Sequence, residues 1–202
     1  MRATFCVLTQ TPRTLGDDAD WCRLPPTANS AEPWDGDCLI PNSANGADCP
    51  DAAAESASAG RRNAVVLNYT DGTREIRQGG SRSWRNNNPG NIRPGNLQGE
   101  IGNAGGFAVF SRESAGQSAI VELLSRPAYQ ALTVFGAINR WAPPVENDTA
   151  AYQARVQNLT GLDGQTQMST LTQGQLESVA NAIRNVEGWT PGRRTCWRQR
   201  AQ

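Results

Sequence analysis

The segment from Trp84 to Arg93 restricts the fold more than any other part of the sequence. It contains four asparagines, a proline and a glycine, in the order Trp-Arg-Asn-Asn-Asn-Pro-Gly-Asn-Ile-Arg. Asparagine and glycine tolerate left-handed backbone angles, and proline fixes φ and lacks an amide donor, so we expect a specific turn rather than a helix or a strand. Asparagine amides donate and accept hydrogen bonds without charge, which suits the hydroxyl and acetamido groups of a sugar. The alternative interpretation is a structural loop whose amides bond only to its own backbone.

Two absent residue types exclude several catalytic mechanisms. The sequence has no histidine, and all its basic residues are arginines because lysine is absent too. Histidine-dependent triads, histidine-ligated zinc, a phosphate-binding lysine and a Schiff base are therefore excluded. Carboxylates, tyrosines and cysteines remain for proton transfer, and carboxylates are what glycosidases use. The formal net charge is zero, so we expect no nucleic-acid partner. No metal ion and no cofactor is expected.

The cysteines divide the chain into two regions. Residues 1–60 are predicted to be a cysteine-rich, loop-rich segment, and residues 61–202 are predicted to form the main domain. Disulfides are the expected staples of such loop-rich sequence, whereas wide and irregular spacing disfavours a zinc site. Cys196 is expected to close back onto the N-terminal part, which leaves one thiol free. The cysteines are Cys6, Cys22, Cys38, Cys49 and Cys196.

The start of the sequence lacks the pattern of a secretory signal, and no apolar run is long enough to cross a membrane. Disulfides nevertheless indicate an oxidising compartment. We therefore expect export by a route that needs no signal peptide, or a chain that begins at an internal domain.

Two β regions are predicted around the asparagine turn. Before it, a strand at residues 64–69 and a returning strand at residues 73–77 are joined by an Asp-Gly hairpin signal. After it, glycine-rich sequence leads to a second small β region that ends at residues 107–110. Residues 51–60 are rich in alanine and serine and are expected to be a connector.

The spacing of apolar residues becomes helical after Ser111, which is the expected N-cap of the first helix. Pro127 is expected in the first turn of a second helix that runs to Trp141. A third helix is expected to begin at a cap formed by Asn147 or Asp148.

The last predicted helix ends at an acidic residue. Thr172 and Gln175 form a capping box, and Gly188 ends the helix after an apolar stripe that continues to Glu187. The negative end of the helix dipole and an apolar neighbourhood both favour a protonated carboxylic acid, which a glycosidase needs to protonate a leaving oxygen. The alternative interpretation is a frayed helix end with Glu187 in water. The arginine-rich tail that follows is expected to be a solvated basic end.

Several motifs follow one another in a distinctive order. The asparagine turn ends in Gly-Asn-Ile-Arg and precedes a glycine-rich hairpin, Phe-Ala-Val-Phe-Ser, a helix and Trp-Ala-Pro-Pro-Val-Glu-Asn-Asp-Thr-Ala-Ala-Tyr. This order resembles the core of the lysozyme-like glucosaminidases that cleave peptidoglycan. It is most similar to bacterial and phage domains with an Arg-Asn-Asn-Asn-Pro-Gly-Asn-Ile-Arg signature, some of which resemble toxins delivered by type VI secretion. The resemblance covers residues 65–192.

The chain departs from the glucosaminidases in the place of the candidate acid. Those enzymes carry their catalytic glutamate on a helix before the asparagine segment, in a Glu-Ser-Gly-Trp-like context. Here the matching context is Val-Glu-Gly-Trp at residues 186–189, so we expect a circular permutation that moves the catalytic helix to the C-terminus. The resemblance implies an α+β, lysozyme-like fold, mainly helical, with a small antiparallel β region and a cleft.

The resemblance also implies a function and a set of site residues. It implies a hydrolase of peptidoglycan glycan strands, with an N-acetylglucosaminidase favoured over a muramidase. Glu187 would protonate the leaving oxygen, while Glu75 or Asp148 would stabilise the oxocarbenium-like state or activate water. Glu75 would take over the acid role if the chain were not permuted. The implied substrate-binding residues are Trp84, Asn88, Asn91, Arg93, Glu146 and Tyr152.

Family and compartment together imply an antibacterial effector that acts in the periplasm of a target bacterium. Such a toxin would meet bacterial peptidoglycan as its substrate and an immunity protein as its inhibitor, without inserting into a membrane. Two other function classes stay open: a lytic transglycosylase, and a non-catalytic peptidoglycan-binding or virion structural module. A cysteine peptidase is disfavoured, because no histidine can activate the thiol.

Overall fold

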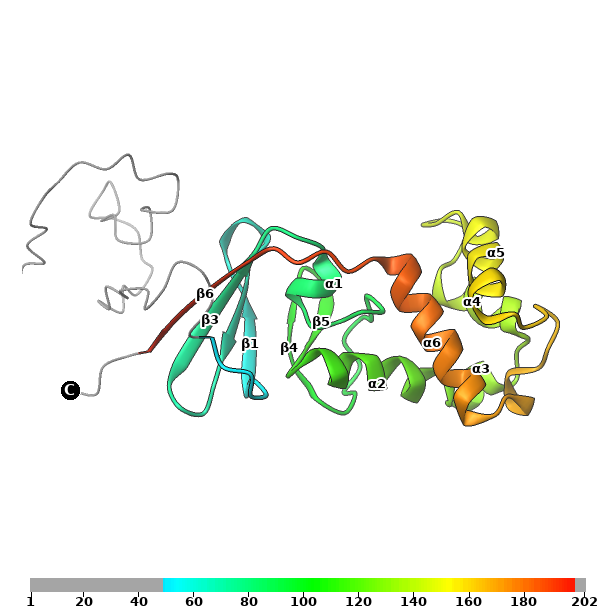
Figure 1. Cartoon of the computed structure of the whole chain (residues 1–202), viewed down its shortest axis with the longest axis horizontal. Coiled ribbons are helices and arrows are strands. Elements are labelled where there is room, and N and C mark those ends of the chain that lie inside the picture. The colour runs from blue at the N-terminus through cyan, green and yellow to red at the C-terminus, as the bar shows by residue number, and fades with distance from the viewer. Residues whose placement is uncertain (1–48, 199–202) are drawn as a thin grey trace, which may run out of the picture. The chain divides into compact units, whose positions relative to one another are not determined.

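The computed structural model describes residues 49–198. Cys6, Cys22 and Cys38 and most of the predicted cysteine-rich segment lie outside the described residues. The described part has an α+β fold. Figure 1 shows a four-stranded sheet, then a β-hairpin, then a group of helices along this part of the chain.

The four-stranded sheet is antiparallel throughout, in the order β1-β2-β3-β6. The β2–β3 hairpin confirms the strands predicted on either side of the Asp-Gly signal, and Gly72 in its turn has a φ of 78°. The strands are β1 (Ser56–Ala59), β2 (Val65–Asn68), β3 (Thr73–Gln78) and β6 (Arg193–Arg198).

Two of these strands lie where other structure was expected. The predicted connector contains β1, which pairs with β2, and the tail predicted to be solvated forms β6 along β3. The tail prediction is wrong because alternate residues of β6 face buried partners: Arg194 bonds Glu75, and Cys196 is bonded to Cys49. The disulfide confirms the expectation that Cys196 closes back onto the N-terminal part.

A second hairpin, β4 (Glu100–Ala104) and β5 (Phe107–Phe110), confirms the predicted glycine-rich β region. Its turn uses Gly105 and Gly106, whose φ angles are 60° and 80°. A Cβ at Gly102 would lie 2.2 Å from the carbonyl oxygen of Ala57, so β1 approaches β4 closely. A small core between the two sheets contains Ala54, Val65, Leu67, Tyr69, Ala104 and Val109.

Six α-helices and two short 3-10 turns complete the described part of the chain. The best predicted is α6, which has the expected capping box of Thr172 and Gln175 and ends before Gly188. The helices are α1 (Arg82–Arg85), α2 (Glu113–Leu124), α3 (Pro127–Gln130), α4 (Val134–Trp141), α5 (Thr149–Thr160) and α6 (Gln173–Glu187), and the 3-10 turns are η2 (Arg61–Asn63) and η3 (Met168–Thr170).

Helix starts were predicted less well than helix ends. The predicted second helix is two helices, because the Thr133 hydroxyl accepts a hydrogen bond from the amide of Gly136 and begins α4 afresh. The N-cap of α2 is Arg112 rather than Ser111. Of the two candidate caps for α5, Asp148 is the one used, through the amide of Ala151.

The main core lies between α2, α4, α5, α6 and one face of the second hairpin. Apolar residues at helical spacing on these elements are almost fully buried, which is the contribution that stabilises amphipathic helices most. The largest fully buried side chains of this core, which also includes Phe110 of β5 and Met168 of η3, are Phe110, Ile120, Leu124, Ile138, Met168, Ile183, Val134 and Val156.

The asparagine turn is pressed against this core through two glycines. A Cβ at Gly116 of α2 would lie 1.9 Å from the carbonyl oxygen of Asn87. A Cβ at Gly90 would lie 2.8 Å from the Trp141 ring and 2.9 Å from a side-chain carbon of Ile120. The turn is therefore packed between α2 and α4 with no room for a further atom.

A buried carboxylate ties the sheet to the turn. Glu75 of β3 is fully buried and accepts hydrogen bonds from Arg77 Nε at 2.7 Å, Arg194 Nε at 2.7 Å and the Tyr69 hydroxyl at 2.6 Å. Arg77 also donates to the carbonyl of Trp84 at 2.9 Å. Burial alone would raise the pKa of Glu75, but the hydrogen bond from Arg194, the charge of Arg77 and the bond from Tyr69 together hold it below its ordinary value of 4.5.

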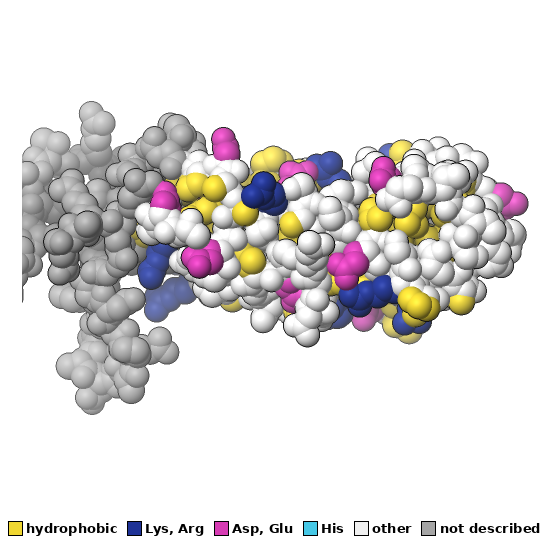
Figure 2. All heavy atoms as spheres, turned by 90° about the horizontal axis from the view of Figure 1, so that it is seen from below, with side chains coloured by type: hydrophobic (Ala, Val, Ile, Leu, Met, Phe, Trp, Pro, Cys, Tyr) yellow, Lys and Arg dark blue, Asp and Glu magenta, His cyan; other side chains and the backbone are white. Residues whose placement is uncertain are grey.

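On the face of the molecule that Figure 2 shows, charged side chains of both signs are interspersed. Figure 2, which views the molecule from below, shows arginines and acidic side chains alternating on this face without a large patch of one sign. None of the helices within residues 49–198 has the length and apolarity needed to cross a bilayer.

We predict that Gly116→Ala destabilises the protein by about 3 kcal/mol or more, because the new methyl group would overlap the turn backbone. The matched control is Gly174→Ala on α6, where a Cβ would meet no atom within 4 Å. This control should stabilise by up to about 1 kcal/mol, since alanine is the better helix former. Urea unfolding followed by tryptophan fluorescence measures both, and equal effects of the two changes would contradict the packing described above.

We predict that Glu75→Gln lowers the free energy of unfolding by about 3 kcal/mol at pH 7, because it leaves the buried guanidinium group of Arg77 and the partly buried one of Arg194 without their carboxylate. The folded pKa of Glu75 lies below its ordinary value of 4.5, so the unfolded chain binds its proton more readily. The stabilisation from Glu75 is therefore complete above that value and is lost as the pH falls through the folded pKa. The difference between the unaltered protein and Glu75→Gln should shrink below about pH 4.5.

Denaturant titrations at several pH values between 7 and 3 measure this difference directly. Glu177→Gln, at an exposed glutamate of α6, serves as the control and should change little at any pH. A difference for Glu75→Gln that is constant across the range would show that the carboxylate is not the stabilising species.

Candidate functional site

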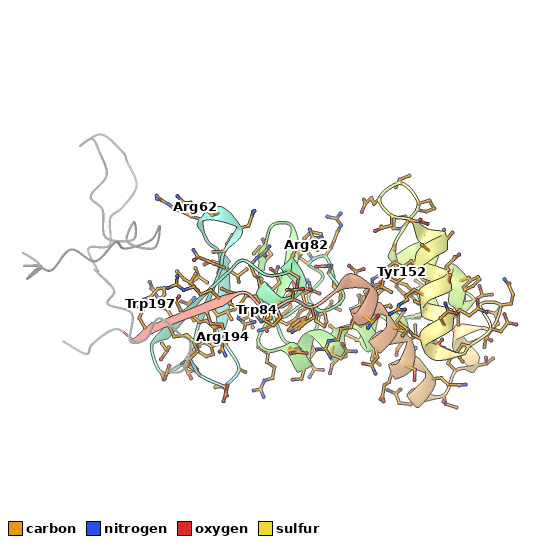
Figure 3. All side chains as sticks on the ribbon, turned by 45° about the horizontal axis from the view of Figure 1, so that its top comes forward. Arg62, Arg82, Trp84, Tyr152, Arg194 and Trp197 are labelled. Atoms are coloured by element: carbon orange, nitrogen blue, oxygen red, sulfur yellow. A yellow bond between two sulfur atoms is a disulfide. The ribbon has the colours of Figure 1, made fainter. Side chains whose placement is uncertain are left out.

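The candidate acid Glu187 lies where three separate segments meet. It is the last residue of α6 and is partly buried. Its carboxylate accepts a hydrogen bond from Asn91 Nδ2 of the asparagine turn at 2.8 Å and another from the Tyr152 hydroxyl of α5 at 3.0 Å. Figure 3 shows Tyr152 on the side of α5 that faces α6. The predicted meeting of this acid with the turn is thus present in the structure.

The end of α6 is fixed in place on both sides of Glu187. On the helix, Arg184 pairs with Glu113 of α2. Beyond it, the Ser83 hydroxyl of α1 donates to the carbonyl of Gly188, and the Ser81 amide donates to the carbonyl of Thr190 at 2.8 Å. The interpretation of a frayed helix end in water is therefore wrong.

The three consecutive asparagines of the turn point inward. Asn86 Nδ2 donates to the carbonyl of Ala104 at 3.2 Å, and Asn87 Nδ2 donates to the carbonyl of Phe110 at 3.0 Å. Asn87 also accepts from Arg77 at 2.6 Å. These amides therefore have a structural role, but they bond to the β4–β5 hairpin and to Arg77 rather than only to the backbone of the turn itself.

Asn88 was predicted to bind substrate, and the structure corrects this. It is fully buried. Its Nδ2 donates to the carbonyls of Ile92 and Ala108 at 2.8 and 2.9 Å, and its Oδ1 accepts from the Ile92 amide at 2.8 Å. Both amide protons and one lone pair of the oxygen are used inside the protein, and full burial keeps the side chain from a sugar.

Asn91 differs from the three inward-pointing asparagines of the turn, because its side chain bonds to Glu187. Its φ is 47°, a left-handed value that asparagine tolerates, and its side chain is partly exposed. While Nδ2 donates to Glu187, Oδ1 accepts from Arg82 Nε at 3.1 Å. The Arg82 guanidinium itself lies over the Phe107 ring, 3.6 Å from the ring centroid. Asn91 therefore connects the acid to an arginine that rests on an aromatic ring.

Tyr152 supplies a donor that does not titrate near neutral pH. Burial, the negative charge of Glu187 and the hydrogen bond to it all raise the pKa of the Tyr152 phenol. The hydroxyl consequently stays protonated and can only donate to the carboxylate. Tyr152 is 6% exposed, so it positions the acid and offers little surface to a ligand.

Glu75 and Trp84 were also predicted as site residues, and both predictions are wrong. The carboxylate of Glu75 is closed off by the Arg77, Arg194 and Tyr69 contacts described above. Trp84 is 7% exposed, and Arg77 lies 5.3 Å from the centroid of its ring, so neither sugar nor water reaches its faces readily. Figure 3 shows Trp84 and Arg194 among the strands and the short helix α1, whereas Arg62 extends away from the ribbon.

Three further predicted site residues are exposed. Arg93 pairs loosely with Glu146, at 3.7 Å and with both side chains about two-thirds exposed, 66% and 60%. Asp148 caps α5 through one carboxylate oxygen. Because Arg93 is two residues from Asn91, the loop that carries Glu146 lies near the turn. No direct contact joins Glu146 or Asp148 to Glu187 among the residues that the structure describes.

Sequence reasoning missed Arg82 and Phe107. Phe107 is the first residue of β5 and shares a strand face with fully buried Val109, so strand alternation does not indicate its partly exposed position. Arg82 carries no signal either, because its role follows from the short helix α1 that Ser81 caps through the amide of Trp84.

One group of potential metal ligands occurs within residues 49–198: Cys49, Glu75 and Cys196, with ligand atoms within 4.8 Å of one another. The two sulfurs are joined in the disulfide, and the carboxylate is bonded to arginines. The group is therefore structural in the oxidised protein.

A surface hollow also lies away from the candidate acid. Its single carboxylate, Glu122, is bonded to Arg126 and to the amide of Gln98. The hollow is lined by Asn96, Leu97, Gln98, Gly99, Ser114, Ala115, Ser118, Ala119 and Glu122. None of the predicted site residues belongs to it.

Comparison of the chain with protein-family models, with curated proteins and with solved structures finds no match. The arrangement of Glu187, Asn91 and Tyr152 is therefore the observation that bears on the chemistry of this site.

Proposed function

We propose that this protein cleaves the glycan strands of bacterial peptidoglycan, with Glu187 as the acid that protonates the leaving oxygen. The observation that carries the proposal is the placement of Glu187 at the end of α6, where Asn91 and Tyr152 each donate to one of its carboxylate oxygens. A proton donor must be held in a defined orientation to act on a glycosidic oxygen, and two donors from two separate segments provide this.

The absence of histidine and lysine from the sequence supports carboxylate chemistry. The packing of α2, α4, α5 and α6 against one face of the β4–β5 hairpin agrees with a lysozyme-like arrangement, in which the catalytic helix is α6, at the C-terminal end of the helical part. The resemblance of the Asn-rich signature favours cleavage on the N-acetylglucosamine side over cleavage on the muramic acid side.

In a hydrolase, a second carboxylate stabilises the oxocarbenium-like state or activates water. With Glu75 closed off, this role falls to Asp148 or Glu146, both of which are exposed. Glu146 is the better placed of the two, because its pairing with Arg93 brings it beside the segment that carries Asn91.

A lytic transglycosylase is the second candidate function. Its chemistry uses one acid and no water, and Glu187 is the one carboxylate within residues 49–198 that is hydrogen-bonded to the turn at Asn91. In this mechanism Glu187 protonates the leaving oxygen and then accepts the proton of a substrate hydroxyl that closes the anhydro ring.

We propose further that the protein acts as an antibacterial effector in the periplasm of a target cell, where an immunity protein neutralises it in related producers. The Cys49–Cys196 disulfide supports an oxidising place of action. An immunity protein that covers Asn91 and Glu187 would block the site without entering the core.

We predict that Glu187→Gln lowers the release of glycan fragments from purified sacculi at least about 100-fold, because the amide cannot donate the proton. The thermal melt should change little, since the amide keeps the shape of the side chain. Mass spectrometry of the fragments separates the mechanisms: reducing N-acetylglucosamine ends, reducing N-acetylmuramic acid ends, or anhydro ends. Glu177→Gln on the same helix is the control, and undiminished release by Glu187→Gln would exclude the proposed acid.

We predict that Tyr152→Phe lowers the same rate roughly 10- to 100-fold, because the ring stays buried while the donor that orients the carboxylate is lost. Tyr129→Phe is the matched control: Tyr129 is partly buried beside Trp141, and no hydrogen bond joins it to Glu187. Equal rates for the two variants would show that the Tyr152 hydroxyl has no part in positioning Glu187.

A further inference from the structure

Two arginines from different segments lie against the ring of Phe107. The Arg82 guanidinium, from α1, is 3.6 Å from the ring centroid, and the Arg93 guanidinium, from the end of the asparagine turn, is 5.2 Å from it. Cations over an aromatic face are attracted by the ring, which also holds the planar guanidinium group flat. The ring of Phe107 therefore holds the guanidinium groups of Arg82 and Arg93 near each other.

Neither arginine is neutralised by a firm ion pair. Arg82 has no carboxylate partner among the residues that the structure describes, and its Nε is used by Asn91. Arg93 is 3.7 Å from Glu146, with both side chains mostly exposed, and such a pair contributes little. Burial lowers the pKa of neighbouring Arg85, and the positive charge of Arg82 lowers it further. Two guanidinium groups without a close carboxylate partner therefore lie beside Phe107.

The arginines are close to the proposed acid. Arg82 is bonded to Oδ1 of Asn91, and Nδ2 of the same amide is bonded to Glu187. If the scissile bond of a substrate lies at Glu187, a neighbouring sugar of that substrate would therefore lie over Arg82 and Arg93. Glycan oxygens alone do not require two guanidinium groups, whereas a carboxylate is bound well by them in a bidentate geometry.

We propose that Arg82 and Arg93, supported by Phe107, form a carboxylate-binding subsite that selects peptidoglycan over neutral glycans such as chitin. The inference rests on the proposed function. In peptidoglycan the carboxylate has two sources: the lactyl group of N-acetylmuramic acid, free where the stem peptide has been removed, and the carboxylates of the stem peptide. The subsite recognises the group that both share.

Binding to the cleavage-blocked Glu187→Gln protein tests the subsite by isothermal titration calorimetry. The ligands are a disaccharide with its stem peptide, the same with the stem carboxylates amidated, a disaccharide with a free lactyl carboxylate, and a chito-oligosaccharide without any carboxylate. Arg93→Gln should weaken binding of the carboxylate-bearing ligands about 10-fold more than that of the chito-oligosaccharide, because a charge-assisted hydrogen bond is lost. Arg82→Gln should have the same selective effect, and the two ligands with a single source of carboxylate identify that source.

Arg126→Gln is the matched control, because Arg126 is an exposed arginine in a surface ion pair with Glu122. It should leave the affinity of every ligand as it was. Equal losses on charged and neutral ligands, or no loss for Arg93→Gln and Arg82→Gln, would overturn the subsite while the unaltered protein still cleaves sacculi. Carboxylate-dependent binding without any cleavage would uphold the subsite and overturn the hydrolase, and absence of both would overturn both.

Discussion

The inward hydrogen bonds of the asparagine turn are the interaction on which the candidate site depends. The amides of Asn86, Asn87 and Asn88 occupy carbonyl groups of the β4–β5 hairpin, and each would cost about 1–3 kcal/mol if it were left buried and unpaired. The turn therefore has one low-energy arrangement. Gly116 lets α2 close over it without space for a methyl group. Asn91, the next asparagine along, is consequently presented outward at a fixed place, and its amide meets the last residue of α6.

Glu75 acts at a distance on both halves of this site. Through Arg77 it reaches Trp84 and Asn87 in the turn, and through Arg194 it holds β6, which leads back to the end of α6. Glu75, which the sequence predicts as a catalytic carboxylate, thus anchors both of the segments that carry Asn91 and Glu187. Its burial beside two guanidinium groups suits that use, because four hydrogen bonds from three side chains, two to each oxygen, fix its position and leave no oxygen for a substrate.

Local chemistry allowed much of the fold and part of the site to be predicted. The hairpin at Gly72, the capping box at Thr172 and the end of α6 at Gly188 are set by residues close together in the sequence, so pattern alone identifies them. The meeting of Glu187 with the turn was predicted from its place on an apolar stripe and from the family resemblance.

The failures have a common physical cause. Whether an amide points inward or outward depends on which carbonyl groups a distant strand brings near, and the sequence of the turn does not contain that information. Asn88 and Asn91 are chemically identical, yet the hairpin occupies one and not the other. For the same reason, the sequence alone predicts neither the strand β6 nor the burial of Glu75. Both depend on the contact between Arg194 and Glu75, which are far apart in the sequence.

The all-arginine composition separates charge from proton transfer in this protein. A guanidinium group stays charged at any pH that the fold survives, so Arg82 and Arg93 can attract a carboxylate but cannot exchange a proton with it. The buried phenol of Tyr152 also keeps its proton, because its pKa is raised. Glu187 is then the one carboxylate in the hydrogen-bonded chain from Arg82 through Asn91 to Tyr152. If the chain is an enzyme, binding and proton transfer are carried by different side chains, and an arginine variant should alter which glycan is bound without altering the group that titrates.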